Sequence, residues 1–498
     1  MEQALRTQNG TARTRRSAAG LEPLWWPVAT ALVLLLQAVL VLRHEPFVDE
    51  WQALQIAVQS PGLTALLANL RYEGHPPLWY LLLRGVANIA GPRHALAAAA
   101  LPLAWTTQAL ILWRSPFPRW LRLLIALGEP VLFEYGAISR SYTLGVMLVF
   151  WAVAAWRSRR WFWLPLALLP LTDFLFGCLS LPLLALRMRE QRLWWPGVAG
   201  WAAASLLAAW TIYPAPDFVP VYRAAASPWQ GTALLLFQLS SVAAPLQWSA
   251  EGPLWSGPLP FGLYRVMWLP FVWLCWEQTR GRRLDRAAVF GLLLVLWTFY
   301  AFLYSLANRH LMLLGVLLVA LQWRRWAEGD APSAAFAAWA AVGAVCGLVA
   351  AASALVVPFD TAPAAARIIR ERGLTGKAWV AAPAQHGQGI AAMTGMRFQG
   401  AGMACTSDFI RWNFPRTIDD ARALGRWVDG EAARRGGFYL LSEVALPPGV
   451  PAVRLARVPA GFDGKAYFLY RIAPDRPEGT RILPPCVPGM RPFPGAGA

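Results

Sequence analysis

The feature that most constrains this chain is a series of long apolar runs separated by short clusters of arginine. The runs recur between residues 24 and 357, and several approach the roughly 20 residues that a helix needs to cross a bilayer. Only 14% of the residues are charged, against about 25% in an average soluble protein. The pattern predicts a polytopic all-α membrane protein.

The formal net charge of +18 raises the question of nucleic-acid binding. The arginines fall between apolar runs, form no continuous basic face and accompany no nucleic-acid-binding motif. We therefore expect contact with membrane lipids and no nucleic-acid partner.

Four parts are predicted along the chain. Residues 1–23 are expected to form a cytoplasmic tail, 24–357 a transmembrane domain, 358–473 a small extracytoplasmic α/β domain, and 474–498 a Pro-rich tail. The only two lysines, Lys377 and Lys465, both lie after residue 358. In the third part, 362–371 and 416–435 have helical patterns, whereas 377–382, 438–442 and 466–472 have the pattern of strands.

Arginine placement sets the predicted orientation, because the side that retains Lys and Arg is normally the cytoplasm. Arg13, Arg15 and Arg16 put the N-terminus inside. Keeping the later basic clusters inside gives about eleven spans, interfacial outer helices at 50–70 and 76–90, and an extracytoplasmic C-terminus. For 161–186, a single span would leave Arg187 outside, so we favour a hairpin with Asp173 near its outer tip.

Five cysteines divide into two groups. Cys178, Cys275 and Cys346 lie in apolar runs and are expected to be small core residues. Cys405 and Cys486 are expected outside the cytoplasm, where disulfides persist, and are predicted to pair. No Cys/His spacing matches a structural zinc site.

An acidic pair, Asp49-Glu50, follows the first apolar run on the predicted outer side. Carboxylates at this place either take part in chemistry or stabilise a helix N-terminus. Arg140 and Arg309 fall on the same side, and each either binds phosphate through its planar fork or snorkels to lipid headgroups. His75, before two prolines, either serves the same site or anchors an interfacial helix.

These motifs together resemble the GT-C superfamily of integral membrane glycosyltransferases, in the branch of protein mannosyltransferases and aminoarabinose transferases. The resemblance rests on the acidic pair after the first span, the sequence Gly-His-Pro-Pro-Leu-Trp-Tyr at 74–80, Ser-Arg-Ser-Tyr at 139–142 and Asn-Arg-His at 308–310. It covers residues 24–323. One departure is Ile138, where relatives often carry an acidic residue two positions before the arginine.

The resemblance implies transfer of a sugar from a polyprenyl-phosphate donor to a glycan, lipid or protein acceptor on the outer face of a bacterial-type cytoplasmic (inner) membrane. It implies that Asp49 is the base or acceptor-positioning residue, with Glu50 second. The expected donor-phosphate ligands are Arg140, Arg309, His310 and His75. The expected substrate-lining residues are Tyr142, Glu134, Trp51 and Trp79.

The sequence therefore predicts an inverting, lipid-dependent glycosyltransferase. It requires no cofactor, although a divalent metal is compatible with phosphate binding. Two other classes stay open, a transporter or lipid flippase and a non-catalytic membrane scaffold for envelope glycan assembly. The polar residues crowd the outer loops, whereas transporters tend to place them near mid-membrane, which favours the enzyme.

Overall fold

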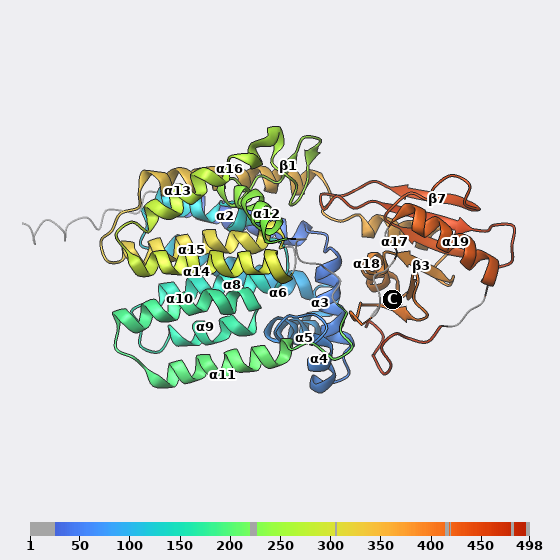
Figure 1. Cartoon of the computed structure of the whole chain (residues 1–498), viewed down its shortest axis with the longest axis horizontal. Helices are drawn as coiled ribbons and strands as arrows, with labels where there is room; N and C mark the ends of the chain where they lie inside the picture. The colour runs from blue at the N-terminus through green and yellow to red at the C-terminus, as the bar shows by residue number, and fades with distance from the viewer. Residues whose placement is uncertain are drawn as a thin grey trace, which may run out of the picture.

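The computed structural model describes residues 25–219, 227–303, 306–413, 418, 420–479 and 483–494. The chain is mostly helical up to residue 357 and continues into a sheet domain, which lies beside one end of the helical region (Figure 1). The arginines at 13–16, which set the predicted orientation, lie outside the described residues.

The helical region contains the following elements in chain order: α2 (Trp25–Arg43), α3 (Val48–Gln59), α4 (Leu63–Leu70), α5 (Leu78–Ala90), α6 (Ala95–Ala109), η1 (Leu110–Arg114), α7 (Arg119–Ala126), η2 (Pro130–Glu134), α8 (Ser141–Ala154), α9 (Trp163–Leu168), η3 (Leu169–Leu171), α10 (Phe174–Glu190), α11 (Trp195–Ile212), α12 (Pro228–Ala243), β1 (Trp248–Ser249), β2 (Gly252–Pro253), η4 (Pro260–Arg265), α13 (Trp268–Gln278), α14 (Arg283–Thr298), η5 (Phe299–Leu303), α15 (Asn308–Trp326) and α16 (Ala334–Val356).

Four helices in the described part of the chain are long and apolar enough to cross a membrane: Trp25–Arg43, Ala95–Arg114, Arg283–Leu303 and Ala334–Val356. The predicted count of about eleven spans is not supported. Several of the other predicted spans are interrupted or short as helices. The run after Arg122, for example, divides into α7 and η2, and α8 has only 14 residues.

The arginine clusters between the helices gather at the end of the helical region far from the sheet domain. Arg157 donates to the carbonyl of Ala327 at 2.7 Å, and Arg187 donates to that of Trp156 at 2.7 Å. Arg324 pairs with Asp285 at 2.6 Å. These contacts join the loop after α8 to the loop after α15 and to the last turn of α10, and they join the last turn of α15 to the first turn of α14. Three arginines that are far apart in sequence, Arg157, Arg187 and Arg324, therefore lie at the same end of the helical region.

Residues 161–186 form two helical segments joined at Asp173. The first consists of α9 and η3, and the second is α10, which Asp173 caps by accepting a hydrogen bond from the backbone N–H of Leu175 at 2.9 Å. The cap explains why the chain turns at this residue.

The C-terminal domain is a six-stranded sheet between helices. Its elements are α17 (Ala362–Glu371), β3 (Trp379–Ala382), η6 (Ala384–Gly387), α18 (Gln388–Thr394), β4 (Phe398–Gly400), β5 (Thr406–Ser407), α19 (Ala421–Arg435), β6 (Phe438–Ser442), β7 (Ala452–Val458) and β8 (Tyr467–Ile472). The strand order is β5-β4-β3-β6-β8-β7, and β3 is parallel to both of its neighbours. Alternate residues of β3 and β6 face α17 and α18 on one side and α19 on the other.

The sheet domain is attached to α3 by glutamine side chains of α3, which form hydrogen bonds with residues 408–410. Gln52 donates to the carbonyl of Ile410 at 2.7 Å and accepts from its N–H at 2.9 Å. Gln59 donates to Asp408 at 2.8 Å. The Pro-rich tail also returns to α3, since the N–H of Arg491 donates to the Gln59 carbonyl at 3.0 Å.

The predicted pairing of Cys405 with Cys486 is confirmed, because these two residues form a disulfide. The bond ties the tail to the sheet beside β5. Cys178, Cys275 and Cys346 are free thiols in the helical region.

Candidate functional site

The N-termini of three helices meet at the end of the helical region that faces the sheet domain. Asp49 is in the first turn of α3, Arg140 is the residue before α8, and Arg309 is the second residue of α15. Unpaired N–H groups and the helix dipole make each such terminus favourable for an anion. The chain itself supplies one anion here, the Asp49 carboxylate.

Asp49 forms ion pairs with both arginines through one oxygen. Its Oδ2 lies 2.8 Å from Nη1 of Arg140 and 3.3 Å from Nη2 of Arg309. Burial raises the pKa of Asp49, but the two guanidinium groups outweigh this effect and lower the pKa below its ordinary value. The Asp49 side chain is 37% exposed, whereas those of Arg140 and Arg309 are 13% and 14% exposed. The carboxylate is therefore ionised at neutral pH and is open to solvent.

The aromatic rings of Phe47 and Trp255 form the floor of the site, on which the guanidinium groups of the two arginines stack. The Arg140 guanidinium lies 5.7 Å from the ring centroid of Phe47, and that of Arg309 lies 5.5 Å from the ring of Trp255. These two rings contact each other edge to face at 5.0 Å, and Phe359 contacts Trp255 at 5.2 Å. Stacking on a rigid surface restricts both guanidinium groups, which favours binding of a planar or tetrahedral anion without further ordering.

Glu50, predicted to be the second catalytic carboxylate, has a structural position. It is fully buried. Its Oε2 accepts from the N–H of Phe47 at 3.1 Å and lies 2.6 Å from Nε2 of His44, while its Oε1 accepts from the N–H of Ser139 at 2.7 Å. Glu50 therefore caps α3 and holds the loop of Arg140 against it, and it does not face the exposed part of the site.

A second group of polar residues borders Asp49. Nδ1 of His75 lies 3.1 Å from Asp173, and the His75 side chain is 33% exposed. Glu73 accepts a hydrogen bond from Gln52 at 2.7 Å. Burial raises the pKa of Glu73 to about 7, and the nearby charge of Asp49 adds to this effect.

Two other predicted site residues are buried supports. His310 accepts at Nδ1 from the N–H of Ala307 at 2.7 Å, which helps to cap α15. Tyr142 stacks on Tyr135 with ring centroids 5.6 Å apart, and the Tyr135 hydroxyl donates to the Arg309 carbonyl. These contacts fix the helix ends that present the arginines, so the predicted ligand role of His310 and lining role of Tyr142 become positioning roles.

Glu134, in contrast, reaches the floor of the site, because its Oε2 accepts from Nε1 of Trp255 at 2.7 Å. It holds the ring on which Arg309 stacks, so it also supports the site without lining it. Ile138, two residues before Arg140, is fully buried in the same apolar cluster.

Trp51 and Trp79 do not line the cluster. Trp79 is 2% exposed and packs among the helices, and Trp51 is 7% exposed and contacts Phe493 of the tail. Their place beside the acidic and His-Pro-Pro motifs in sequence suggested a sugar-binding role. In a helix, however, neighbours in sequence point to different faces.

Sequence reasoning did not place Trp255, Lys465 or Glu73 in this site. Trp255 comes from the long loop before η4, and Lys465 from a turn of the sheet domain that is close enough to lower the pKa of Asp49. The sequence feature that could have drawn attention to Lys465 is the rarity of lysine, since the chain contains only two.

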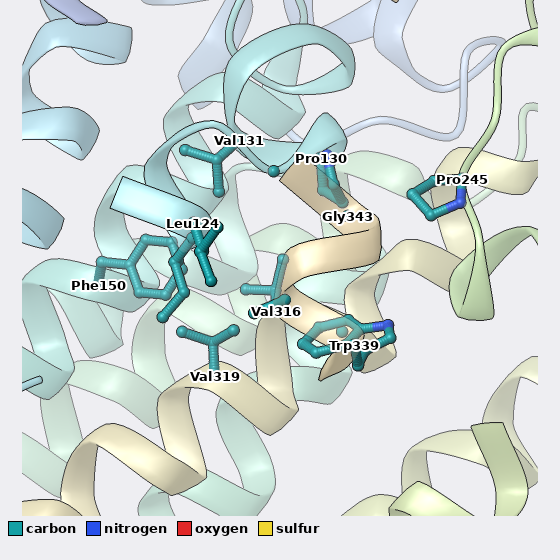
Figure 2. A pocket seen from close by; sticks show the side chains of 13 residues that line it. Leu124, Pro130, Val131, Phe150, Pro245, Val316, Val319, Trp339 and Gly343 are labelled. Carbon is teal, nitrogen blue, oxygen red and sulfur yellow. The ribbon is translucent and has the colours of Figure 1, made fainter. Parts of the chain in front are cut away.

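A small apolar cavity lies between α7, α8, α15 and α16 (Figure 2). Figure 2 shows Phe150, Val316, Val319 and Trp339 around it. Its lining on α15 begins at Gly315, which is six residues, or about 9 Å along the helix axis, beyond Arg309. The same helix therefore carries a cation at its end and an apolar cavity further along.

Within the described residues, no three His, Cys, Asp or Glu side chains are grouped as metal ligands. The arrangement is instead suited to binding a phosphate or a similar anion beside a carboxylate. Comparison of the chain with family models, curated proteins and solved structures finds no match.

Proposed function

We propose that this protein is a GT-C-type membrane glycosyltransferase that moves a sugar from a polyprenyl-phosphate-linked donor to an acceptor, with inversion, at the outer face of the cytoplasmic membrane. The observation that carries the proposal is the convergence of three helix N-termini and two guanidinium groups on the partly exposed Asp49. A carboxylate beside an anion-binding group is what this reaction requires.

Arg140 and Arg309 bind the donor phosphate. As the bond between the anomeric carbon and the phosphate oxygen breaks, negative charge grows on the departing lipid phosphate. Fixed cations that need no rearrangement stabilise this charge in the transition state. The aromatic floor of Phe47 and Trp255 keeps both guanidinium groups in place.

The acceptor hydroxyl attacks the anomeric carbon from the face opposite the phosphate, so a single displacement inverts the configuration. Asp49 orients this hydroxyl by accepting its hydrogen bond. Because two arginines lower its pKa, Asp49 is a weak base. Glu73 has a pKa of about 7 and is electrostatically coupled to Asp49, which suits it to take the proton.

The apolar side chains of α15 around this small cavity support a lipid-linked donor. An isoprenoid tail needs apolar walls close to the phosphate site, and the cavity begins about 9 Å along the helix from Arg309. The disulfide in the sheet domain supports the outer side, because disulfides persist in oxidising compartments.

The test is consumption of polyprenyl-phosphate hexoses and pentoses by the protein reconstituted in lipid vesicles. Asp49→Asn is expected to lower the rate of polyprenyl-phosphate release by roughly 10²-fold, because the acceptor hydroxyl is no longer oriented for attack. Arg189→Gln, an exposed change at the opposite end of the molecule, is the control and should leave the rate unchanged. Undiminished turnover by Asp49→Asn would remove this site from the mechanism.

A further inference from the structure

Lysine is nearly absent from this chain, and one of its two lysines lies beside the candidate site. Lysine and arginine together number 45, yet only Lys377 and Lys465 are lysines. Lys377 pairs with Glu478 at 3.1 Å, in the sheet domain. Lys465 follows Gly464, a glycine with φ of +79°, on a turn that reaches toward the helical region.

The turn at 461–465 is attached to the helical region through backbone hydrogen bonds. The N–H of Trp255 donates to the Phe462 carbonyl at 2.8 Å, and the N–H of Phe462 donates to the Pro358 carbonyl at 2.8 Å. The Phe462 ring contacts Phe133 at 5.7 Å. Trp255 is the residue on which Arg309 stacks. One residue therefore positions both the arginine and the turn that carries Lys465.

The charge of Lys465 reaches the site. Together with Arg140 and Arg309, it lowers the pKa of Asp49, although burial acts in the opposite direction. Among the described residues, its ammonium group forms no ion pair within 4 Å and no hydrogen bond. The lysine ammonium group has three N–H donors on a flexible side chain. It can therefore move to contact a bound ligand, whereas an arginine stacked on an aromatic ring is held in place.

Two carboxyl groups that interact with the charge of Lys465, those of Asp360 and Asp463, take their hydrogen bonds from groups other than its ammonium. Asp360 accepts from the N–H of Ala362 at 2.6 Å and from the Tyr467 hydroxyl at 2.9 Å. Burial raises the pKa of Asp360, and burial together with Asp360 raises that of Asp463 to about 7. Asp463 accepts instead from the backbone N–H of Lys465 at 3.0 Å.

We propose that Lys465 is the third cation of the anion site, so that a bound phosphate is held between the helical region and the sheet domain. The inference rests on the proposed function and extends it by giving the sheet domain a direct contact with the donor. This role of Lys465 also gives a reason for the hydrogen bond between the N–H of Trp255 and the Phe462 carbonyl, which fixes the turn at 461–465.

The experiment compares binding of polyprenyl phosphate to the full-length protein in lipid nanodiscs. Lys465→Met should bind roughly 10- to 150-fold more weakly than the wild type, as expected for one hydrogen bond to a charged group. Lys465→Arg should retain most of the affinity. The matched control is Lys377→Met, the same change at the other lysine, which should bind as the wild type does. Thermal unfolding of each variant is measured in parallel.

Two results would overturn the inference without touching the proposed function. One is unchanged binding by Lys465→Met while Arg140→Gln binds more weakly. The other is weaker binding that accompanies a lower unfolding temperature and is not restored by Lys465→Arg, which would make Lys465 a structural residue. If the wild type binds polyprenyl phosphate no better than neutral polyprenol, the proposed function itself fails.

Discussion

At the scale of single residues, the adjacent acids Asp49 and Glu50 have different tasks. Asp49 presents a partly exposed carboxylate to two arginines, whereas Glu50 is buried and accepts backbone hydrogen bonds from Phe47 and Ser139 on different oxygens. The sequence predicted chemistry for both, because it could not show which carboxylate faces into the fold.

A matched pair of amide substitutions tests this division. In Glu50→Gln, one of the two backbone N–H groups faces an NH₂ group and loses its acceptor, at a cost of about 1–3 kcal/mol. The unfolding temperature of Glu50→Gln should therefore fall by a few degrees, and that of Asp49→Asn should change little, because its side chain is 37% exposed. A larger fall in Asp49→Asn would contradict these assignments.

Glu73 gives the site a dependence on pH. Its pKa rises from 4.5 to about 7 on folding, so the folded protein binds the proton more tightly than the unfolded chain does. The contribution of Glu73 to stability is present at low pH and is lost as pH rises from about 4.5 to 7. Glu73→Gln should therefore match the wild type in unfolding temperature near pH 5 and exceed it near pH 8. An equal difference at both pH values would exclude the raised pKa.

At the scale of elements, the close approach of α16 to the segment before η2 depends on a glycine. A Cβ on Gly347 would lie 2.1 Å from the carbonyl oxygen of Leu127, which is backbone and cannot move aside. A Cβ on Gly343, one turn earlier in α16, would meet nothing within 4 Å. The two positions share a helix but differ in the space around them.

Alanine at these positions gives a paired prediction. Gly347→Ala should destabilise the protein by about 1–3 kcal/mol, as overpacking of a core does. Gly343→Ala should be neutral or stabilise by up to about 1 kcal/mol, since alanine favours a helix. Chemical unfolding in detergent compares the two. Similar losses at both positions would show that α16 does not pack as described.

At the scale of the whole molecule, the arginine pattern predicted that Asp49, Arg140 and Arg309 share a side, and in the structure these three residues form ion pairs. Pairings across hundreds of residues cannot be read from sequence, so the parts played by Trp255 and Lys465 were not visible. The span count failed for a related reason, because apolar runs do not show where a helix breaks, as at η2.

The sheet domain shows the same limit. Strands β3, β6 and β8 and helices α17 and α19 coincide with predicted segments, because their apolar faces are regular. The short strands β4 and β5 were missed, and so was β7, whose arginines Arg454 and Arg457 interrupt the apolar pattern. Their place is set by neighbouring strands more than by their own residues.

The central claim is that the helix termini at Asp49, Arg140 and Arg309 bind the phosphate of a lipid donor. Its most direct test compares retention of polyprenyl phosphate and neutral polyprenol by the purified protein, using native mass spectrometry. We predict that the wild type retains the phosphorylated lipid selectively and that the double variant Arg140→Gln/Arg309→Gln loses this selectivity. Equal retention of both lipids by the wild type, or selectivity that survives in the double variant, would contradict the claim.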